Sequence, residues 1–105
     1  MKLTGKCKEN FEVWFEDKYD NNNTSDVIML QTEFDSMPFE FKYSVYVDYF
    51  DSVGVDIEIC KYPIAQQYYY MINDGDEENI FETRPQARVA AIERANKLHN
   101  EVLSN

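Results

Sequence analysis

Residues 39–60, FEFKYSVYVDYFDSVGVDIEIC, contain the change of hydrophobic period that decides the fold. Up to Val53 the large apolar side chains recur every three or four residues, which is the spacing of one face of an α-helix. Gly54 follows, and glycine readily adopts the left-handed conformation in which helices end. Apolar and polar residues then alternate from Val55 to Cys60, as in a strand with one buried face. We therefore predict a helix that ends at Gly54 and leads directly into a β-strand. Its buried face is predicted to consist of Phe39, Tyr43, Tyr46, Phe50 and Val53.

An amphipathic helix is also predicted before this stretch, from Thr4 to Tyr19, with Thr4 as its N-cap. Residues 20–26, DNNNTSD, end it, since Asn and Asp side chains hydrogen-bond nearby backbone groups and favour turns. Residues 27–34 are compatible with three structures: an extension of the next helix, an edge strand, or a segment that packs across the core. The apolar face of this first helix is predicted to consist of Leu3, Cys7, Phe11, Trp14 and Phe15.

Two more strands are predicted after Cys60. Gln66–Asn73 contains three consecutive tyrosines and is typical of a strand, and Asp74-Gly75 is a strong hairpin-turn signal. A short third strand is then predicted at Ile80–Glu82. Together the three segments predict an antiparallel sheet of three strands.

The last helix begins with a clear sequence signal. Thr83 and Gln86 stand three residues apart, as in a capping box, and Pro85 fits the first helical turn. The inner stripe is predicted to be Ala87, Ala91, Ala95, Leu98 and Val102, flanked by Ile92 and Leu103. The prediction is a single α+β domain over residues 1–105, in the order α-α-β-β-β-α, with helices covering a three-stranded antiparallel sheet.

The charge of the chain limits its partners. The formal net charge is −10. The stretch between Tyr19 and Cys60 contains nine acidic residues and one basic residue, Lys42. Since nucleic-acid phosphates and anionic membranes both attract Lys and Arg, this charge argues against binding to either. The chain lacks a run of about 20 apolar residues that would cross a membrane, and its opening lacks the apolar core of a secretory signal. We therefore expect a cytoplasmic protein in which Cys7 and Cys60 are free thiols.

Residues with catalytic or metal-binding spacing are missing from the sequence. His99 is the single histidine and has no metal-ligand partner nearby in sequence, which favours a partly exposed histidine on a helix. The acidic run around Asp74 lacks the glycine and the closing glutamate of a calcium loop. We therefore predict no enzymatic activity, no metal and no cofactor.

Two groups of residues are candidates for partner binding. The first consists of four acidic residues, Asp48, Asp51, Asp56 and Glu58, which also fit a solvated acidic surface. The second is Tyr68, Tyr69 and Tyr70, of which the first and third point to one face of the strand and the second to the other. Tyrosine supplies contact area at low entropic cost, so exposed tyrosines beside acids suit a protein-binding surface, while ordinary sheet packing is the alternative.

Two resemblances add to this interpretation. The predicted β-β-β-α portion from Val55 onward resembles in topology the double-stranded-RNA-binding domain, but only Arg84 and Arg88 stand where that domain places its phosphate-binding lysines. The segments KLTGKCKENFEVWFE, YFDSVGVDIEI and FETRPQARVAAIERANKLHNE resemble small uncharacterised proteins of Bacteroides phages and mobile elements. That second resemblance implies a genomic setting and not an activity.

These observations predict an accessory protein that binds a host or phage protein. One alternative is an acidic mimic of DNA that inhibits a host DNA-binding or defence factor, in which carboxylates replace phosphates. Another is a weak nucleic-acid-binding domain that uses the last helix.

Overall fold

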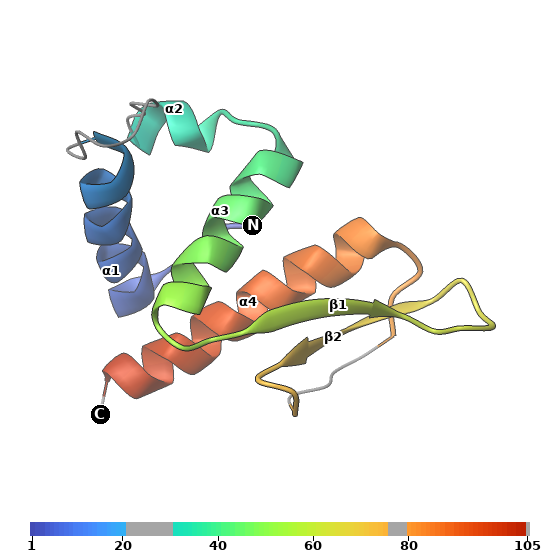
Figure 1. The fold of residues 1–105 in the computed structure, drawn as a ribbon. Helices are drawn as coiled ribbons and strands as arrows, with labels where there is room; N and C mark the ends of the chain where they lie inside the picture. Colours follow the sequence, from blue (N-terminus) through green and yellow to red (C-terminus); the bar gives the residue numbers. More distant parts are fainter. Residues whose placement is uncertain (21–30, 76–79, 105) are drawn as a thin grey trace.

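The computed structural model describes residues 1–20, 31–75 and 80–104 (Figure 1). It confirms the α+β class, with helices at both ends of the chain and a two-stranded antiparallel sheet between them. The elements are α1 (Gly5–Phe15), a π-helical turn η1 (Glu16–Asp20), α2 (Gln31–Asp35), α3 (Phe39–Ser52), β1 (Ile57–Lys61), β2 (Tyr68–Ile72) and α4 (Arg84–Leu103). Residues 20–26 and 27–34 fall largely outside the described residues; of the second segment, the end forms the beginning of α2.

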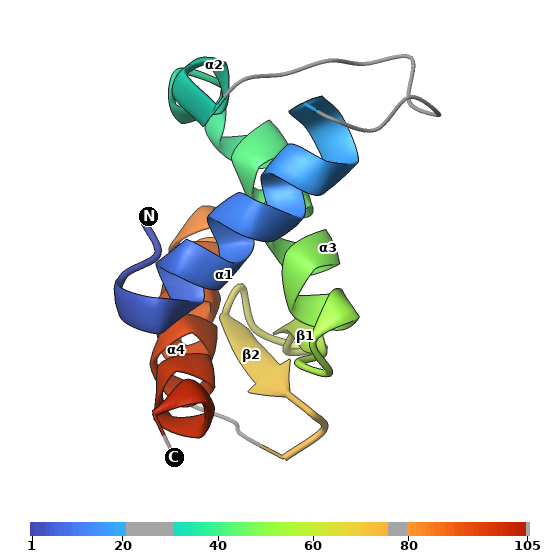
Figure 2. The same cartoon turned by 90° about the vertical axis from the view of Figure 1, so that its left-hand side faces the viewer.

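The long helix α4 organises the molecule, because it contacts both strands as well as α1 and α3. Figures 1 and 2 show α4 running along one face of the hairpin formed by β1 and β2, with α1 packed on its C-terminal half. Helix α3 lies along α4, from the ion pair of Glu40 with Arg88 to the contact of Phe50 with His99. Thr83 and Gln86 form the predicted capping box at its start, with both reciprocal hydrogen bonds present. Gly54 has φ +83° and ends the turn after α3, as the change of period predicted.

The prediction of a third strand is wrong. Ile80–Glu82 contributes a single bridge, in which Tyr68 and Phe81 exchange two backbone hydrogen bonds of 2.8 Å. The turn after β2 has positive φ at Asn73 and Asp74 and is closed by a hydrogen bond from the Gly75 N–H to the Ile72 carbonyl. A regular hairpin closed by that turn would pair residue 79 with Tyr68, about two residues out of step with the observed bridge.

The capping box then starts α4 within two residues of Phe81, so pairing cannot extend past the bridge on that side. The predicted β-β-β-α portion, which carried the likeness to the double-stranded-RNA-binding domain, is therefore wrong too.

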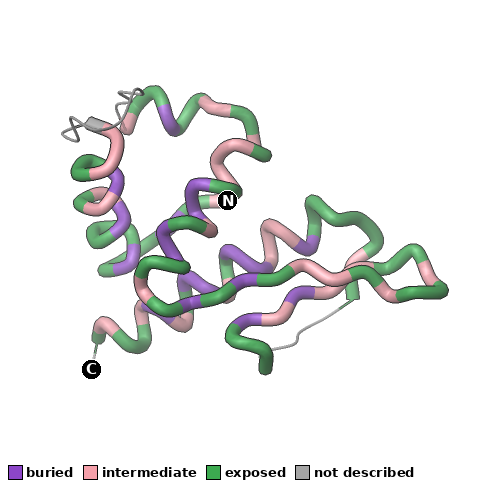
Figure 3. The backbone as a smooth tube through the Cα atoms, viewed as in Figure 1, coloured by how far each residue is buried: buried purple, intermediate pink, exposed green. Residues whose placement is uncertain are grey.

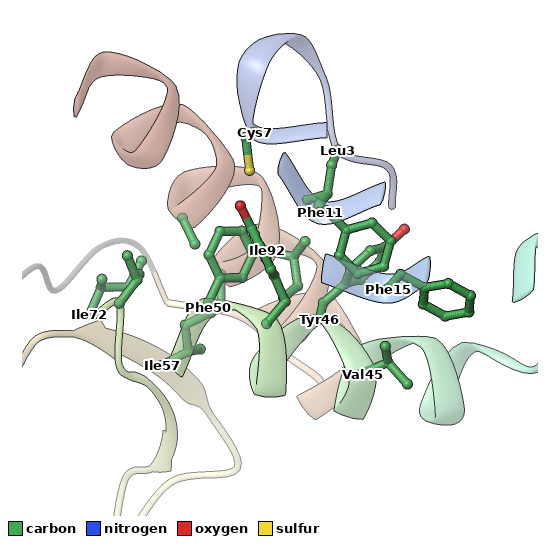
Figure 4. Close-up of a cluster of buried hydrophobic side chains, with 14 of the residues drawn as sticks. Leu3, Cys7, Phe11, Phe15, Val45, Tyr46, Phe50, Ile57, Ile72 and Ile92 are labelled. Atoms are coloured by element: carbon green, nitrogen blue, oxygen red, sulfur yellow. The ribbon is translucent and has the colours of Figure 1, made fainter. Parts of the chain in front are cut away.

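An aromatic cluster forms the core beneath α1 and α3. Phe11 lies at its centre, with ring centroids 5.1–5.8 Å from those of five other aromatic residues: Trp14, Phe15, Phe34, Tyr46 and Tyr49. Figure 4 shows side chains from α1, α3, α4 and both strands converging on this region. The sheet contributes Ile57 and Ile72, which are cross-strand partners and both buried. One continuous core therefore joins all the main elements.

The buried face of α4 differs from the predicted stripe near its C-terminus. Ala87, Ala91 and Ala95 are buried as expected, but Val102 is 67% exposed and Leu98 only half-buried. His99, predicted to be partly exposed, is 5% exposed. The reason is a change of neighbours along α4: only its last turns contact the start of α1, and there the end of α3 packs on His99. The buried face of α3 is likewise rotated from the predicted one, since Val45 and Tyr49 are buried while Phe39 and Tyr43 are half-buried.

The start of α1 is held by α4. Thr4 occupies the N-cap position but its side chain makes no capping bond. Instead the Asn100 Oδ1 accepts a 2.8 Å hydrogen bond from the Cys7 N–H, and its Nδ2 donates to the Thr4 carbonyl at 3.0 Å. Asn96, one turn earlier on α4, bonds both the backbone N–H and the hydroxyl of Thr4. Two asparagines of one helix therefore replace the cap of another.

Candidate functional site

Five of the seven predicted site residues lie along one exposed surface, which we call the acid–tyrosine strip. It begins with Asp48 and Asp51, exposed on α3, and continues through Asp56 and Glu58 onto the face of the hairpin that α4 does not cover. Figure 3 shows exposed positions at the end of α3 and along the hairpin. Residues of β1 at alternate positions share that face, and the register places Glu58 opposite Met71 and Cys60 opposite Tyr69. The strip consists of Asp48, Asp51, Asp56, Glu58, Cys60, Tyr62, Tyr69 and Met71.

The acidic half of the strip is dense enough to change a pKa. The pKa of Asp51 is raised by partial burial, and also by the negative charges of Asp56 and Asp48. Since the charges of Asp56 and Asp48 both act on Asp51, the three carboxylates lie close together and this end of the strip presents a concentrated negative field. Asp56 is held in place by a hydrogen bond from its N–H to the Asn73 Oδ1, 2.8 Å long.

Lys18 limits that field at one end. Its Nζ lies 4.0 Å from a carboxylate oxygen of Asp48 and also stands over the rings of Trp14 and Tyr19, at 5.0 and 5.7 Å from their centroids. An exposed pair at this distance contributes little to stability. Its effect is to end the acidic half of the strip at Asp48.

The other half of the strip is aromatic. The rings of Tyr62 and Tyr69 are 4.7 Å apart between centroids, and both residues are half-buried. Cys60 and Met71 are also half-buried, so the surface beside the two rings is apolar. A pair of contacting tyrosines is already ordered and loses little further entropy when a partner binds.

Tyr68 and Tyr70 lie on the opposite face of the sheet, as the alternation predicted. Tyr70 is 2% exposed and belongs to the core, where its ring stacks near that of Phe81. Tyr68 is half-buried, with the Arg84 guanidinium 5.0 Å from its ring centroid. Of the three consecutive tyrosines, Tyr69 alone faces outward with the strip. Tyr62 was not predicted as a site residue. Strand alternation could have indicated it, because position 62 falls on the same face as Glu58 and Cys60.

The buried polar groups near the core are kept neutral. Burial raises the pKa of the Cys7 thiol to about 11, against a small opposing effect of the Tyr49 hydroxyl, and raises that of Tyr49 to about 12. A thiol with so high a pKa is a poor nucleophile at neutral pH. Both cysteines are free, as predicted.

Within residues 1–20, 31–75 and 80–104 the structure contains no group of three or more His, Cys, Asp or Glu side chains placed to hold a metal ion. No helix in the described part of the chain has the length and apolar character needed to cross a membrane.

His99 makes stability depend on pH. Its ring contacts those of Tyr49 and Phe50, its Nε2 is buried with no hydrogen-bond partner, and burial lowers its pKa below the ordinary value of 6.5. A lowered pKa means that His99 stabilises the fold fully above about pH 6.5 and that this contribution is lost as the pH falls towards the folded-state pKa. We expect the free energy of unfolding to fall between pH 7 and 5, by at most about 1.4 kcal/mol per pH unit from this group.

Urea titrations of the wild type and of His99→Gln across that range test the prediction. The slope with pH should be smaller in the variant, whatever its absolute stability. Equal slopes would show that His99 is not the group responsible. Asp51 acts in the opposite sense, because its raised pKa makes protonation favour the folded state as the pH falls.

Comparison of the chain with protein-family models, with curated proteins and with solved structures found no match.

Proposed function

We propose that this protein is a non-enzymatic cytoplasmic interaction module that binds a protein partner through the acid–tyrosine strip. The observation that carries the proposal is the continuity of the strip: a negative field at Asp48, Asp51 and Asp56 leads into an ordered pair of tyrosine rings on an uncovered sheet face. The partner that fits is a protein surface with basic residues beside an apolar contact.

The two halves of the strip have different roles in binding. Charges at the edge of an interface mainly accelerate association, whereas buried aromatic residues dominate affinity. Tyr62 and Tyr69 are thus expected to carry most of the binding free energy, and the carboxylates to raise the association rate. A phage or mobile-element origin, which rests on the sequence resemblance, makes a host or phage protein the partner.

A DNA-mimic function is the second candidate, and the clustering of Asp51 with Asp48 and Asp56 favours it. Four carboxylates in a row provide charges that a DNA-binding cleft recognises. Two features of the structure favour protein binding over mimicry: the strip ends in an aromatic surface, and Lys18 neutralises part of the charge at Asp48.

Affinity capture from a bacterial host lysate with paired variants separates these functions. Tyr62→Ala with Tyr69→Ala removes the aromatic half, while Asp48→Asn, Asp51→Asn, Asp56→Asn and Glu58→Gln neutralise the acidic half. The matched control neutralises four other exposed acids, Glu9, Asp17, Glu33 and Glu101. We expect a partner that the wild type and control retain in about 0.5 M NaCl, and that the tyrosine variant binds at least ~30-fold more weakly with purified components.

The acidic variant should slow association without abolishing binding. A partner lost in about 0.5 M NaCl and on acid neutralisation, but kept by the tyrosine variant, would establish mimicry instead. A partner that every variant retains equally would show that the strip is not the binding site.

A further inference from the structure

The outer edge of β1 is an open edge of the sheet. Among the described residues the sheet contains only β1 and β2, so β1 has one neighbouring strand, whereas the far side of β2 carries the bridge from Tyr68 to Phe81. In Figure 1, β1 begins beside the end of α3 and runs away from it towards the loop that precedes β2. An edge strand presents a row of backbone N–H and C=O groups with which another chain can pair.

The register shows which backbone groups of β1 point to that edge. The Asn73 N–H donates to the Asp56 carbonyl at 2.9 Å, and the Tyr62 N–H donates to the Gln67 carbonyl at 3.0 Å. Because hydrogen-bonded pairs alternate along an antiparallel ladder, the even-numbered residues of β1 make the bonds to β2. Within the part of the chain that the structure describes, the groups that point away from β2 have no hydrogen-bond partner: the N–H and C=O of Ile57, Ile59 and Lys61.

The charges along this edge differ in sign between its two ends. Glu58 is exposed at the start of β1, directly after Asp56 and Ile57, while Lys61 is exposed at its end. Asp51 lies close enough to Asp56 to be affected by its charge. Every charged side chain in the stretches that the structure leaves undescribed is acidic, so none of them can reverse the negative sign at the first end. The edge is therefore complementary to a strand with a basic residue opposite Glu58 and an acidic residue opposite Lys61.

Between the two charged residues the edge is flanked by apolar side chains. Cys60 is half-buried on the face of the strip, and Ile59 is half-buried on the opposite face. A strand paired with β1 places one side chain directly opposite each of these residues, at about 4.5–5.5 Å between Cβ atoms. Antiparallel pairing is the more stable arrangement per residue. Read in the direction of such a strand, the side chains that fit are acidic, apolar, apolar and basic.

We infer that the partner protein binds as an extended segment that forms a third strand, antiparallel to β1 at its outer edge, with the order acidic, apolar, apolar, basic. This inference rests on the proposed function and names how the partner is recognised. Main-chain hydrogen bonds give such a complex its affinity, and the alternating side chains give its specificity. The added strand extends the face that carries the acid–tyrosine strip, with its basic residue beside Glu58. A second copy of the chain is a poorer occupant, because each copy carries a net charge of −10.

Amide hydrogen exchange followed by NMR, with and without a synthetic peptide, tests the inference. The probe is a capped peptide of about ten residues with Glu-Val-Val-Arg at its centre and threonine on both sides. In the free protein the amides of Ile57, Ile59 and Lys61 should exchange faster than those of Glu58 and Cys60, which are bonded to β2. Addition of about 1 mM probe should slow exchange of the outer set at least about 5-fold and leave the inner set unchanged.

A control peptide tests the order of the side chains. It has Arg-Val-Val-Glu at its centre, so that in the same antiparallel register both of its charges lie opposite like charges of β1. It should bind at least about 10-fold more weakly than the probe. Binding of the control as tight as that of the probe would overturn the inferred order.

A proline variant tests the use of the backbone. Lys61→Pro removes an N–H that points away from β2, so the hairpin should tolerate it. The variant should show no protection at about 1 mM probe, whereas Lys61→Ala, which keeps the N–H and loses only the charged side chain, should bind less than about 5-fold more weakly than the wild type. Slow exchange at Glu58 and Cys60 in each variant verifies that its hairpin is folded.

Outer-edge amides that the probe leaves unprotected would overturn the inference. Amides already protected in the free protein would overturn it as well, in favour of a second copy if the protection rises with protein concentration. The proposed function is tested separately, because affinity capture depends on the side chains of Tyr62 and Tyr69 while the probe depends on backbone groups of β1. A captured partner that needs those tyrosines but leaves the outer edge unprotected would overturn this inference alone.

Discussion

Replacing Phe11 by alanine is expected to destabilise the protein more than any other single truncation in α1. Its ring is 4% exposed and contacts five aromatic rings from α1, α2 and α3. Phe→Ala changes in a core cost about 3–5 kcal/mol, and lost aromatic pairs add about 0.5–1.5 kcal/mol. A domain of this size is stable by about 5–15 kcal/mol, so Phe11→Ala should leave a substantial unfolded fraction at 37 °C.

Urea denaturation followed by circular dichroism measures this effect. Val13→Ala is the matched control: it is two residues away on the same helix, its side chain is 69% exposed, and it should change stability by under about 0.5 kcal/mol. Phe11→Leu should lie between the two, because leucine fills part of the space. Similar urea midpoints for Phe11→Ala and Val13→Ala would mean that α1 does not pack on α3 as described.

The features predicted from the sequence are those encoded within a few residues. The capping box of Thr83 and Gln86, the left-handed Gly54 and the change of period around it all depend on local backbone sterics and side-chain hydrogen bonds. The opposite faces of Tyr69 and Tyr70 follow from strand alternation in the same way. Acidic residues at positions 48, 51, 56 and 58 could therefore be recognised as a set from the sequence.

The features that the sequence did not predict depend on contacts between distant segments. The third strand fails because the register of the bridge between Tyr68 and Phe81 is out of step with the turn that precedes it. The buried face of α4 rotates towards His99 because α1 and α3 pack on its last turns, and no local pattern encodes that docking. An apolar groove is lined by Phe39, Phe81 and Val89, which come from three separate segments. Sequence reasoning has no signal for such a surface until the topology is known.

Replacing Asn100 by alanine is expected to detach the start of α1 from α4. The variant removes the acceptor of the Cys7 N–H and the donor to the Thr4 carbonyl. Each hydrogen bond contributes about 0.5–1.5 kcal/mol, and a partly buried donor left without a partner costs more. Since Thr4 makes no capping bond of its own, nothing in the described chain replaces the lost acceptor. We expect a loss of about 2–3 kcal/mol, with faster amide hydrogen exchange in the first turn of α1.

Glu101→Ala is the control for this change, because Glu101 is the adjacent, exposed residue of α4 and its loss should change stability by under about 0.5 kcal/mol.

Gly5 allows a stricter test. Its φ is +61°, and a Cβ there would lie 2.9 Å from the Asn100 Oδ1. Gly5→Ala is therefore destabilising both through backbone strain and through this collision. In the Asn100→Ala background the collision disappears and the strain stays, so Gly5→Ala should cost less there than in the wild type. Equal costs in the two backgrounds would show that Asn100 does not hold the first turn of α1.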